Sequence, residues 1–121
     1  RLGSMSRDSI DIACFSEDYR PGCESANREN CRLVIESKRF SSGVANVALT
    51  QAEKYARHLP NCNLILVTNG YCYKAYERSD STSAFRQRPS AYLNIRGPRD
   101  RYPLDPENVH GAFEVLRLLL P

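Results

Sequence analysis

One strand-like stretch limits how this chain can fold: Leu33-Val34-Ile35, followed directly by Glu36-Ser37-Lys38-Arg39. Three consecutive aliphatic residues, two of them β-branched, predict a strand that is buried on both faces. A carboxylate and an ammonium at the end of such a strand are costly, because an unpaired charge at the edge of a core loses hydration worth on the order of several kcal/mol. The stretch therefore predicts that something binds there, and our working hypothesis is a divalent metal ion and a scissile phosphate group.

The length of the chain predicts one domain, residues 1–121, with a single hydrophobic core. Its apolar content of 41% is below the typical value of about 45–50%, which suits a thin domain or one cut from a larger chain. Residues 1–6 carry no helix or strand signal and are interpreted as a tag or a loop. The segment from Leu116 to Leu120 is still apolar where the sequence ends.

Basic residues are distributed unevenly along the chain. The net charge is only +3, from 17 basic and 14 acidic residues, so the overall field is weak. In a segment with Gly and Pro, however, five arginines accompany a single acid, Asp100; they are Arg86, Arg88, Arg96, Arg99 and Arg101. Such a loop is suited to follow a phosphate backbone, and a solvated loop is the alternative.

The cysteine pattern argues against both a zinc site and a complete disulfide framework, because five is an odd number and no CxxC pair occurs. Cys14, Cys31 and Cys72 lie in strand-like runs and are interpreted as small buried hydrophobic residues. No apolar run has the length of a membrane span or a signal-peptide core. We therefore expect a cytoplasmic location.

A second strand with an acid is predicted at Ser9–Phe15, where Asp11 lies among apolar neighbours. Alternation places Asp11 on one face with Ala13 and Phe15, and Ile10, Ile12 and Cys14 on the other. The polar segment 16–32 is interpreted as a long turn. If this turn is symmetric about positions 23 and 24, the two strands pair antiparallel and Asp11 faces Glu36.

Two like charges facing each other destabilise an ordinary sheet, whereas a cation between them reverses the effect. The predicted pairing of Asp11 with Glu36 therefore supports a metal site. The alternative is that Asp11 pairs with a nearby arginine, Arg7 or Arg39.

After a loop at Phe40–Gly43, helical spacing predicts an amphipathic helix over residues 45–59 that ends before Pro60. Its apolar stripe consists of Ala48, Ala52, Tyr55, Ala56 and Leu59. Gln51 and Tyr55 lie one turn apart on one margin of that stripe. They are either routine boundary residues or residues that reach a site at the sheet edge.

Two further strand-like runs, 63–68 and 71–77, flank Asn69-Gly70, which predicts a hairpin with a type I′ turn. A loop is expected over 78–90 and an edge strand over Ala91–Ile95. Asp105-Pro106-Glu107 predicts the start of a last helix. Its expected buried stripe is Val109, Ala112, Phe113, Leu116 and Leu120.

The order of these motifs resembles the PD-(D/E)xK nuclease superfamily and, more narrowly, the N-terminal nuclease domain of type I restriction enzyme R subunits. The matching motifs, within residues 8–120, are Ser9-Ile10-Asp11, Val34-Ile35-Glu36-Ser37-Lys38, Gln51-Ala52-Glu53-Lys54-Tyr55 and Val67-Thr68-Asn69-Gly70. The resemblance implies an α/β fold with a restriction-endonuclease-like core, in which a mixed β-sheet is flanked by helices.

The resemblance further implies a Mg²⁺-dependent deoxyribonuclease of a restriction or other defence system, with Mn²⁺ as a substitute. The implied catalytic residues are Asp11, Glu36, Lys38, Gln51 and Tyr55. The implied metal ligands are Asp11, Glu36 and the backbone carbonyl of Ser37, and the implied DNA contacts are Arg39, Thr68 and Asn69. The implied partners are DNA and other restriction-system subunits or a motor domain outside this chain.

The chemistry of these residue types agrees with this interpretation. Carboxylate and carbonyl oxygens are the hard ligands that Mg²⁺ prefers. Lys38 is two residues after Glu36 and therefore on the same face of the strand, where it could orient a water and neutralise a phosphate.

The sequence departs from the family pattern in two places. Ile10 stands where the superfamily name has proline. Family members also begin with a helix that packs on the sheet, and nothing upstream of Arg7 predicts one. Either the domain is truncated or it dispenses with that helix.

Two other hypotheses remain open. The first is a catalytically silent nuclease-like fold that binds nucleic acid or protein, for which loss of the charged residues would be the expected mark. The second is an α/β domain whose charges form structural ion pairs, which leaves unexplained why Asp11, Glu36 and Lys38 all fall on apolar strands.

Overall fold

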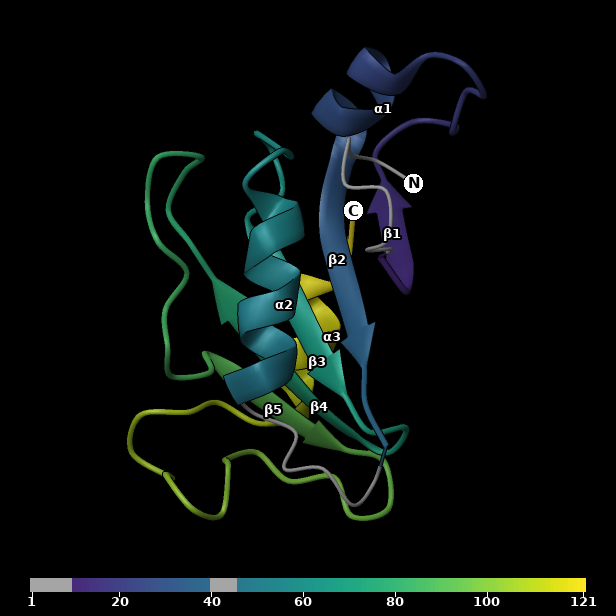
Figure 1. Ribbon diagram of the computed structural model, residues 1–121. Helices are drawn as coiled ribbons and strands as arrows, with labels where there is room; N and C mark the ends of the chain where they lie inside the picture. The colour runs from purple at the N-terminus through teal and green to yellow at the C-terminus, as the bar shows by residue number, and fades with distance from the viewer. Residues whose placement is uncertain (1–9, 40–45) are drawn as a thin grey trace.

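A mixed five-stranded β-sheet with helices on both faces forms the body of the molecule in the computed structural model, which describes residues 10–39 and 46–121 (Figure 1). The elements are β1 (Ile12–Phe15), α1 (Glu24–Asn30), β2 (Cys31–Ser37), α2 (Asn46–Ala56), β3 (Leu64–Thr68), β4 (Cys72–Glu77), β5 (Ala91–Asn94) and α3 (Ala112–Leu118). The strands lie in the order β1-β2-β3-β4-β5, and β2 and β3 are parallel while all other neighbours are antiparallel. The predicted α/β class and mixed sheet are confirmed.

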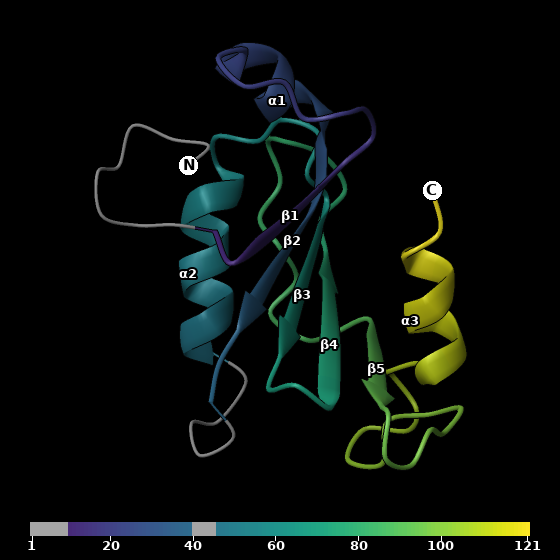
Figure 2. The same ribbon diagram turned by 90° about the vertical axis from the view of Figure 1, so that its right-hand side faces the viewer.

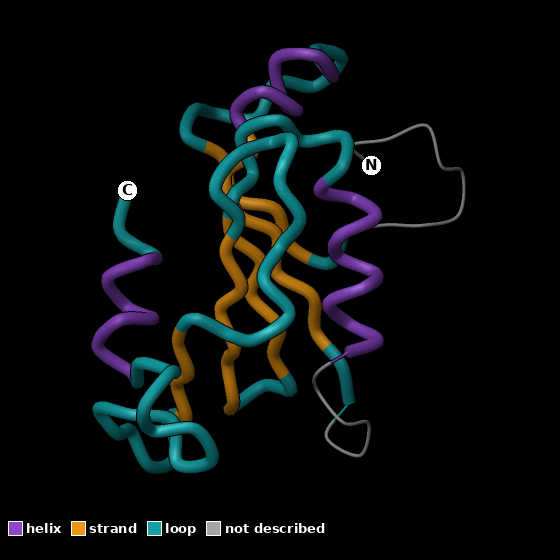
Figure 3. Tube along the Cα trace, turned by 90° about the vertical axis from the view of Figure 1, so that its left-hand side faces the viewer, coloured by secondary structure: helices purple, strands orange, loops and turns teal. Residues whose placement is uncertain are grey.

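Helix α2 covers one face of the sheet and α3 covers the other (Figures 2 and 3). The predicted apolar stripe is confirmed, since all five of its residues are buried, although the last of them, Leu59, lies after the end of α2. This stripe packs on the sheet through a cluster that includes Val34, Ile65 and Val67. A second cluster, under α3, includes Leu33, Leu66 and Val115. The core thus lies in two layers, one on each side of the sheet.

Strand β2 contributes to both layers, as its three aliphatic residues predicted. Val34 belongs to the cluster under α2, whereas Leu33 and Ile35 belong to the cluster under α3. Because side chains alternate along a strand, Glu36 shares the α2 face with Val34. The parallel neighbours β2 and β3 also bring their carboxyl ends to the same edge of the sheet.

The predicted register between the first two strands is confirmed for Ile12↔Ile35, Ala13↔Val34 and Cys14↔Leu33, with an irregularity after Cys14. Asp11 lies one residue before β1. Two details of the prediction were wrong. The connection is not only a turn, because it contains α1, and Ile10 packs with the α2-side cluster since it precedes the regular strand.

The last helix begins later than predicted, at Ala112 instead of near Asp105. His110 is held in an extended conformation: its N–H donates to the carbonyl of Ser90, and its carbonyl accepts from the N–H of Tyr92. This pairing with the start of β5 prevents a continuous helix. The predicted stripe was therefore wrong in part, because Phe113, Leu116 and Leu120 are exposed while Val109 and Val115 are fully buried.

The β3–β4 hairpin is confirmed, but its turn is not type I′. Thr68 pairs with Tyr73, which leaves a four-residue connection. Only glycines have positive φ among the described residues, so Asn69 does not, while Gly70 has φ +103°. The Asn69 Oδ1 atom instead accepts hydrogen bonds from the N–H groups of Tyr71 and Cys72. The amide side chain stabilises the turn in place of the left-handed backbone.

Other boundaries agree to within a few residues. Helix α2 ends at Ala56, three residues before the predicted end. The predicted edge strand is β5, at the edge of the sheet. Several predictions lie outside the described residues: the tag or loop at residues 1–6, Arg7, the loop at 40–43 and the helix start at 45.

All five cysteines are free thiols. Cys31 is buried as predicted, whereas Cys14 and Cys72 are only half-buried. Within residues 10–39 and 46–121, no helix combines the length and apolar character that crossing a bilayer requires.

Candidate active site

The candidate site lies where the carboxyl end of β2 meets the amino end of β1 and the carboxyl end of β3 (Figure 1). Ser37 pairs with Thr68 on the parallel strand β3. On the other side, the antiparallel register brings the residue before β1 next to the end of β2. Residues from three chain segments therefore converge at this edge.

Asp11 is exposed and is attached to the end of β2. Its Oδ2 atom accepts hydrogen bonds from the backbone N–H of Ser37, at 2.8 Å, and from the Ser37 Oγ–H, at 3.2 Å. The bond from the Ser37 N–H extends the hydrogen-bond ladder between β1 and β2, with the Asp11 carboxylate as acceptor in place of a backbone carbonyl. It holds the Asp11 carboxylate beside the residues that follow Glu36.

Glu36 is the buried carboxylate of the site, with a relative exposure of 1%. Its Oε1 atom lies 3.2 Å from Nζ of Lys38, while Oε2 has no hydrogen-bond partner among the described residues. Burial raises the pKa of Glu36, the negative charge of Asp11 raises it further, and the hydrogen bond and charge of Lys38 partly oppose this. The carboxylate is thus poorly compensated by the protein alone.

Helix α2 supplies a polar chain that ends on Lys38. The Lys38 Nζ donates to Oε1 of Gln51 at 2.7 Å, and the Gln51 Nε2 donates to the hydroxyl of Tyr55 at 3.1 Å. Gln51 and Tyr55 lie one helical turn apart on the margin of the buried stripe, as the sequence predicted. The chain holds the ammonium of Lys38 beside Glu36.

Of the three predicted DNA contacts, Thr68 ends β3 and pairs with Ser37, Asn69 follows it, and Arg39 lies two residues after the end of β2. Thr68 is buried; its carbonyl accepts from the N–H of Lys38 at 2.9 Å, and its Oγ1 accepts from the N–H of Gly70. The Asn69 Oδ1 is used by the turn, so its Nδ2 is the side-chain group suited to donate to a phosphate. Arg39 is exposed at the end of the β2 segment.

The residues present fit a divalent cation. A buried carboxylate oxygen without a partner is rare in a protein interior and calls for an explanation such as an ion. Glu36 Oε2 is such an atom, and the charge of Asp11 acts on the same carboxylate. Within the described ranges, no cluster of three or more His, Cys, Asp or Glu residues could hold a metal. A site here would consist of two carboxylates and the carbonyl of Ser37.

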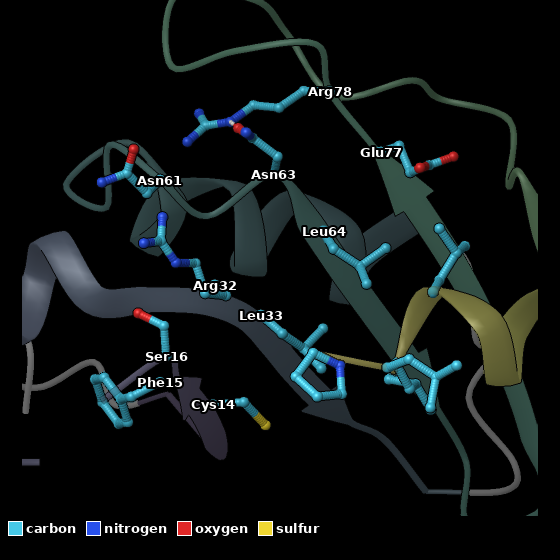
Figure 4. A pocket seen from close by; sticks show the side chains of 14 residues that line it. Cys14, Phe15, Ser16, Arg32, Leu33, Asn61, Asn63, Leu64, Glu77 and Arg78 are labelled. Atoms are coloured by element: carbon cyan, nitrogen blue, oxygen red, sulfur yellow. Dashed lines mark hydrogen bonds between the residues drawn. The ribbon is translucent and has the colours of Figure 1, made fainter. Parts of the chain in front are cut away.

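A groove of about 580 Å³ lies elsewhere, on the α3 side of the sheet (Figure 4). It is lined by residues such as Cys14, Leu33 and Leu64 together with the chain end at Leu118–Pro121. Leu33 faces away from Glu36 because the two differ by an odd number of residues on β2. The groove is therefore separate from the candidate active site.

Sequence reasoning missed two features of the site. It did not foresee that Ser37 anchors Asp11 with both its N–H and its hydroxyl group. It also did not single out Lys74, which the register places on the same sheet face as Glu36. The alternation within β4 could have found Lys74 once the hairpin register was known.

The mixed sheet flanked by helices, with two carboxylates and a lysine gathered at the junction of its first two strands, defines a restriction-endonuclease-like core. The chain belongs to the family described as type I restriction enzyme R protein N terminus, whose model matches residues 2–90. It is accordingly a nuclease-like domain of the restriction-system type. The match includes all candidate site residues and ends before β5 and α3. No curated protein and no solved structure matches the chain.

Proposed function

We propose that this domain is a Mg²⁺-dependent DNA endonuclease that hydrolyses phosphodiester bonds, with Mn²⁺ as a possible substitute. The observation that carries the proposal is the buried carboxylate of Glu36, whose Oε2 is unpartnered in the described part of the chain and which lies next to Lys38. Burying an anion without a partner costs free energy unless a cation binds to it. The family membership supports a nuclease rather than another metal-binding protein.

Asp11, Glu36 and the Ser37 carbonyl would hold the metal ion. When bound, Mg²⁺ would supply Lewis acidity to the phosphate and would lower the pKa of a bound water. The Asp11 oxygen offered to the metal would be Oδ1, which is not used in the two hydrogen bonds to Ser37.

Lys38 would stabilise the negative charge that develops on the phosphate. Its ammonium has three hydrogens, and two of them are directed to Glu36 and Gln51. The third can donate to a phosphate oxygen or to the attacking water. Gln51 and Tyr55 would act on Lys38 as positioning residues, because they hold its ammonium through a chain of hydrogen bonds.

DNA is the proposed partner, with Arg39, Thr68 and Asn69 as proposed contacts. We also propose that the domain works with other restriction-system subunits, including a motor domain, as its family suggests. The hypothesis of a catalytically silent fold has no specific observation in its favour, since Asp11, Glu36 and Lys38 are all present and Nζ of Lys38 lies 3.2 Å from Glu36.

The test is cleavage of supercoiled plasmid and of single-stranded DNA with Mg²⁺ or Mn²⁺, with EDTA as the first control. We expect nicking that needs the metal and that is lost in Lys38→Ala and in Asp11→Ala. Lys54→Ala is the matched control, since Lys54 is an exposed lysine of α2, and it should cut at the normal rate. Cleavage that persists in Lys38→Ala would refute the assigned chemistry.

A further inference from the structure

Strand β4 places a lysine in the same row of the sheet as Glu36. The register pairs Glu36 with Val67 on β3 and Val67 with Lys74 on β4. Paired residues of neighbouring strands project from the same face, and the flanking residues Tyr73 and Ala75 belong to the opposite, α3-side cluster. Lys74 is two strand spacings from Glu36, or about 10 Å.

The ammonium of Lys74 has an aromatic ring beside it and forms no ion pair with a carboxylate of the described residues. Its Nζ lies 5.3 Å from the centroid of the Tyr102 ring, and that ring packs on Tyr92 with the centroids 4.4 Å apart. The side chain is half-buried, and the described residues give it no carboxylate within ion-pair distance. A ring face attracts a cation but does not neutralise it. Lys74 is therefore held in place with its charge available for an anion.

A second cation lies at the same end of the sheet. The N–H of Ile95 donates to the carbonyl of Tyr71 at 2.9 Å, which attaches the segment after β5 to the β3–β4 turn. The guanidinium of Arg96 lies 4.4 Å from the centroid of the Tyr71 ring and is exposed. In Figure 1 the ends of β2 and β5 and the β3–β4 turn lie together at the lower end of the molecule.

The structure separates Arg96 from other arginines of the Arg86–Arg101 segment. Arg88 is paired with Asp105 at 3.2 Å, and Arg101 contacts His110. Arg86 is at the opposite end of the sheet, since its N–H donates to the carbonyl of Glu77 at the end of β4. Of these four arginines, Arg96 is the one that lies against Tyr71 of the β3–β4 turn.

We propose that Lys74 and Arg96 bind backbone phosphates of DNA on the β4–β5 side of the candidate active site. The substrate would then extend from Lys38 across the β3–β4 turn to the end of β5. The separation of about 10 Å between Glu36 and Lys74 equals the axial rise of about three base pairs of a duplex. This inference rests on the proposed DNA substrate, and it adds the direction in which the DNA backbone crosses the protein surface.

The experiment measures binding of a short fluorescent duplex in EDTA at several salt concentrations, so that no cleavage is needed. The slope of log K against log salt is negative, and each lost phosphate contact reduces its magnitude by about one unit. We expect Lys74→Met combined with Arg96→Ala to bind more weakly at low salt and to lose about two units of slope. Methionine keeps an aliphatic chain against the Tyr102 ring, and the melting temperature checks that the fold is retained.

Arg86→Ala is the matched control, because it removes the same charge from an exposed arginine at the other end of the sheet. It should bind with nearly the slope of the unmodified protein, and Lys74→Arg should restore the slope lost in Lys74→Met. An unchanged slope in the double variant, or no binding by the unmodified protein, overturns the inference. If the double variant loses slope but the unmodified protein cuts no DNA, the proposed catalysis is refuted and the assignment of Lys74 and Arg96 to DNA binding is retained.

Discussion

Replacing Glu36 with glutamine should stabilise the metal-free protein. The substitution keeps the shape of the side chain and removes a charge that is 1% exposed and whose Oε2 atom has no partner in the described part of the structure. It also ends the repulsion between Glu36 and Asp11 that contributes to the raised pKa of Glu36. Against this, the ion pair with Lys38 is lost, although Lys38 keeps its hydrogen bond to Gln51.

The magnitude follows from these opposing effects. A buried polar group without a partner costs about 1–3 kcal/mol, and a charged one costs more. The glutamine amide is also buried. The variant therefore gains only the difference between the free energy of burying a charged group and that of burying a neutral amide. The lost attraction to a partly exposed lysine is worth about 0–1 kcal/mol. We therefore expect a gain of about 1–2 kcal/mol, which for an entropy of unfolding of about 0.25 kcal/mol/K raises the melting temperature by about 4–8 °C.

The pH dependence has a definite sign. Because the pKa of Glu36 is raised in the folded protein, the native state holds this proton more tightly than the unfolded state does. The stability of the unmodified protein thus falls, relative to the glutamine variant, as pH rises from the ordinary value of 4.5 through the raised pKa. The advantage of the variant should be small in acid and constant above the raised pKa.

Thermal and urea unfolding in EDTA, at several pH values, measure this difference. Glu107→Gln is the control, because Glu107 is exposed and has no ion pair within the described ranges, and its effect should stay within about 0.5 kcal/mol. A Glu36→Gln variant that is less stable at neutral pH would refute the reasoning. Glu36 and Lys38 would then form a stabilising structural ion pair.

Three further outcomes are expected. Ca²⁺ at about ten times its Kd should stabilise the protein by about 1.4 kcal/mol, or about 5–6 °C in melting temperature, and Asp11→Ala should remove most of this shift; equal shifts would argue against the site. Gly111→Ala should destabilise by about 1–3 kcal/mol, because its added Cβ would lie 1.9 Å from the carbonyl oxygen of Arg99, whereas Gly97→Ala meets open space and should be nearly neutral in the same unfolding assay. Leu66→Ala should cost about 2–5 kcal/mol in chemical denaturation, since Leu66 is 1% exposed between the sheet and α3.

Local sequence patterns were sufficient to predict those features that depend on a single helix, strand or hairpin. The stripe of α2, the burial of β2 on both faces and the β3–β4 hairpin follow from spacing that each segment carries in itself. The register of β1 on β2 was also predicted, from the assumption that the connecting segment is symmetric about positions 23 and 24, and the observed pairs agree with it as far as Cys14.

Other features depended on partners far away in the sequence. Asp105-Pro106-Glu107 is a strong local helix signal, yet His110 pairs with the backbone of Ser90 and Tyr92, and α3 begins only at Ala112. Backbone hydrogen bonds to a strand edge outweighed the local propensity.

The sequence by itself determined which charged and polar groups this domain brings to the ends of its strands, because alternation along a strand and helical periodicity assign each side chain to a face. Only the tertiary structure decided how those groups meet: the Ser37 N–H on Asp11, the chain from Lys38 through Gln51 to Tyr55, and Lys74 in the row of Glu36. These contacts join segments that are distant in the chain. Their geometry is set by the register and packing of the whole sheet, which no single segment encodes.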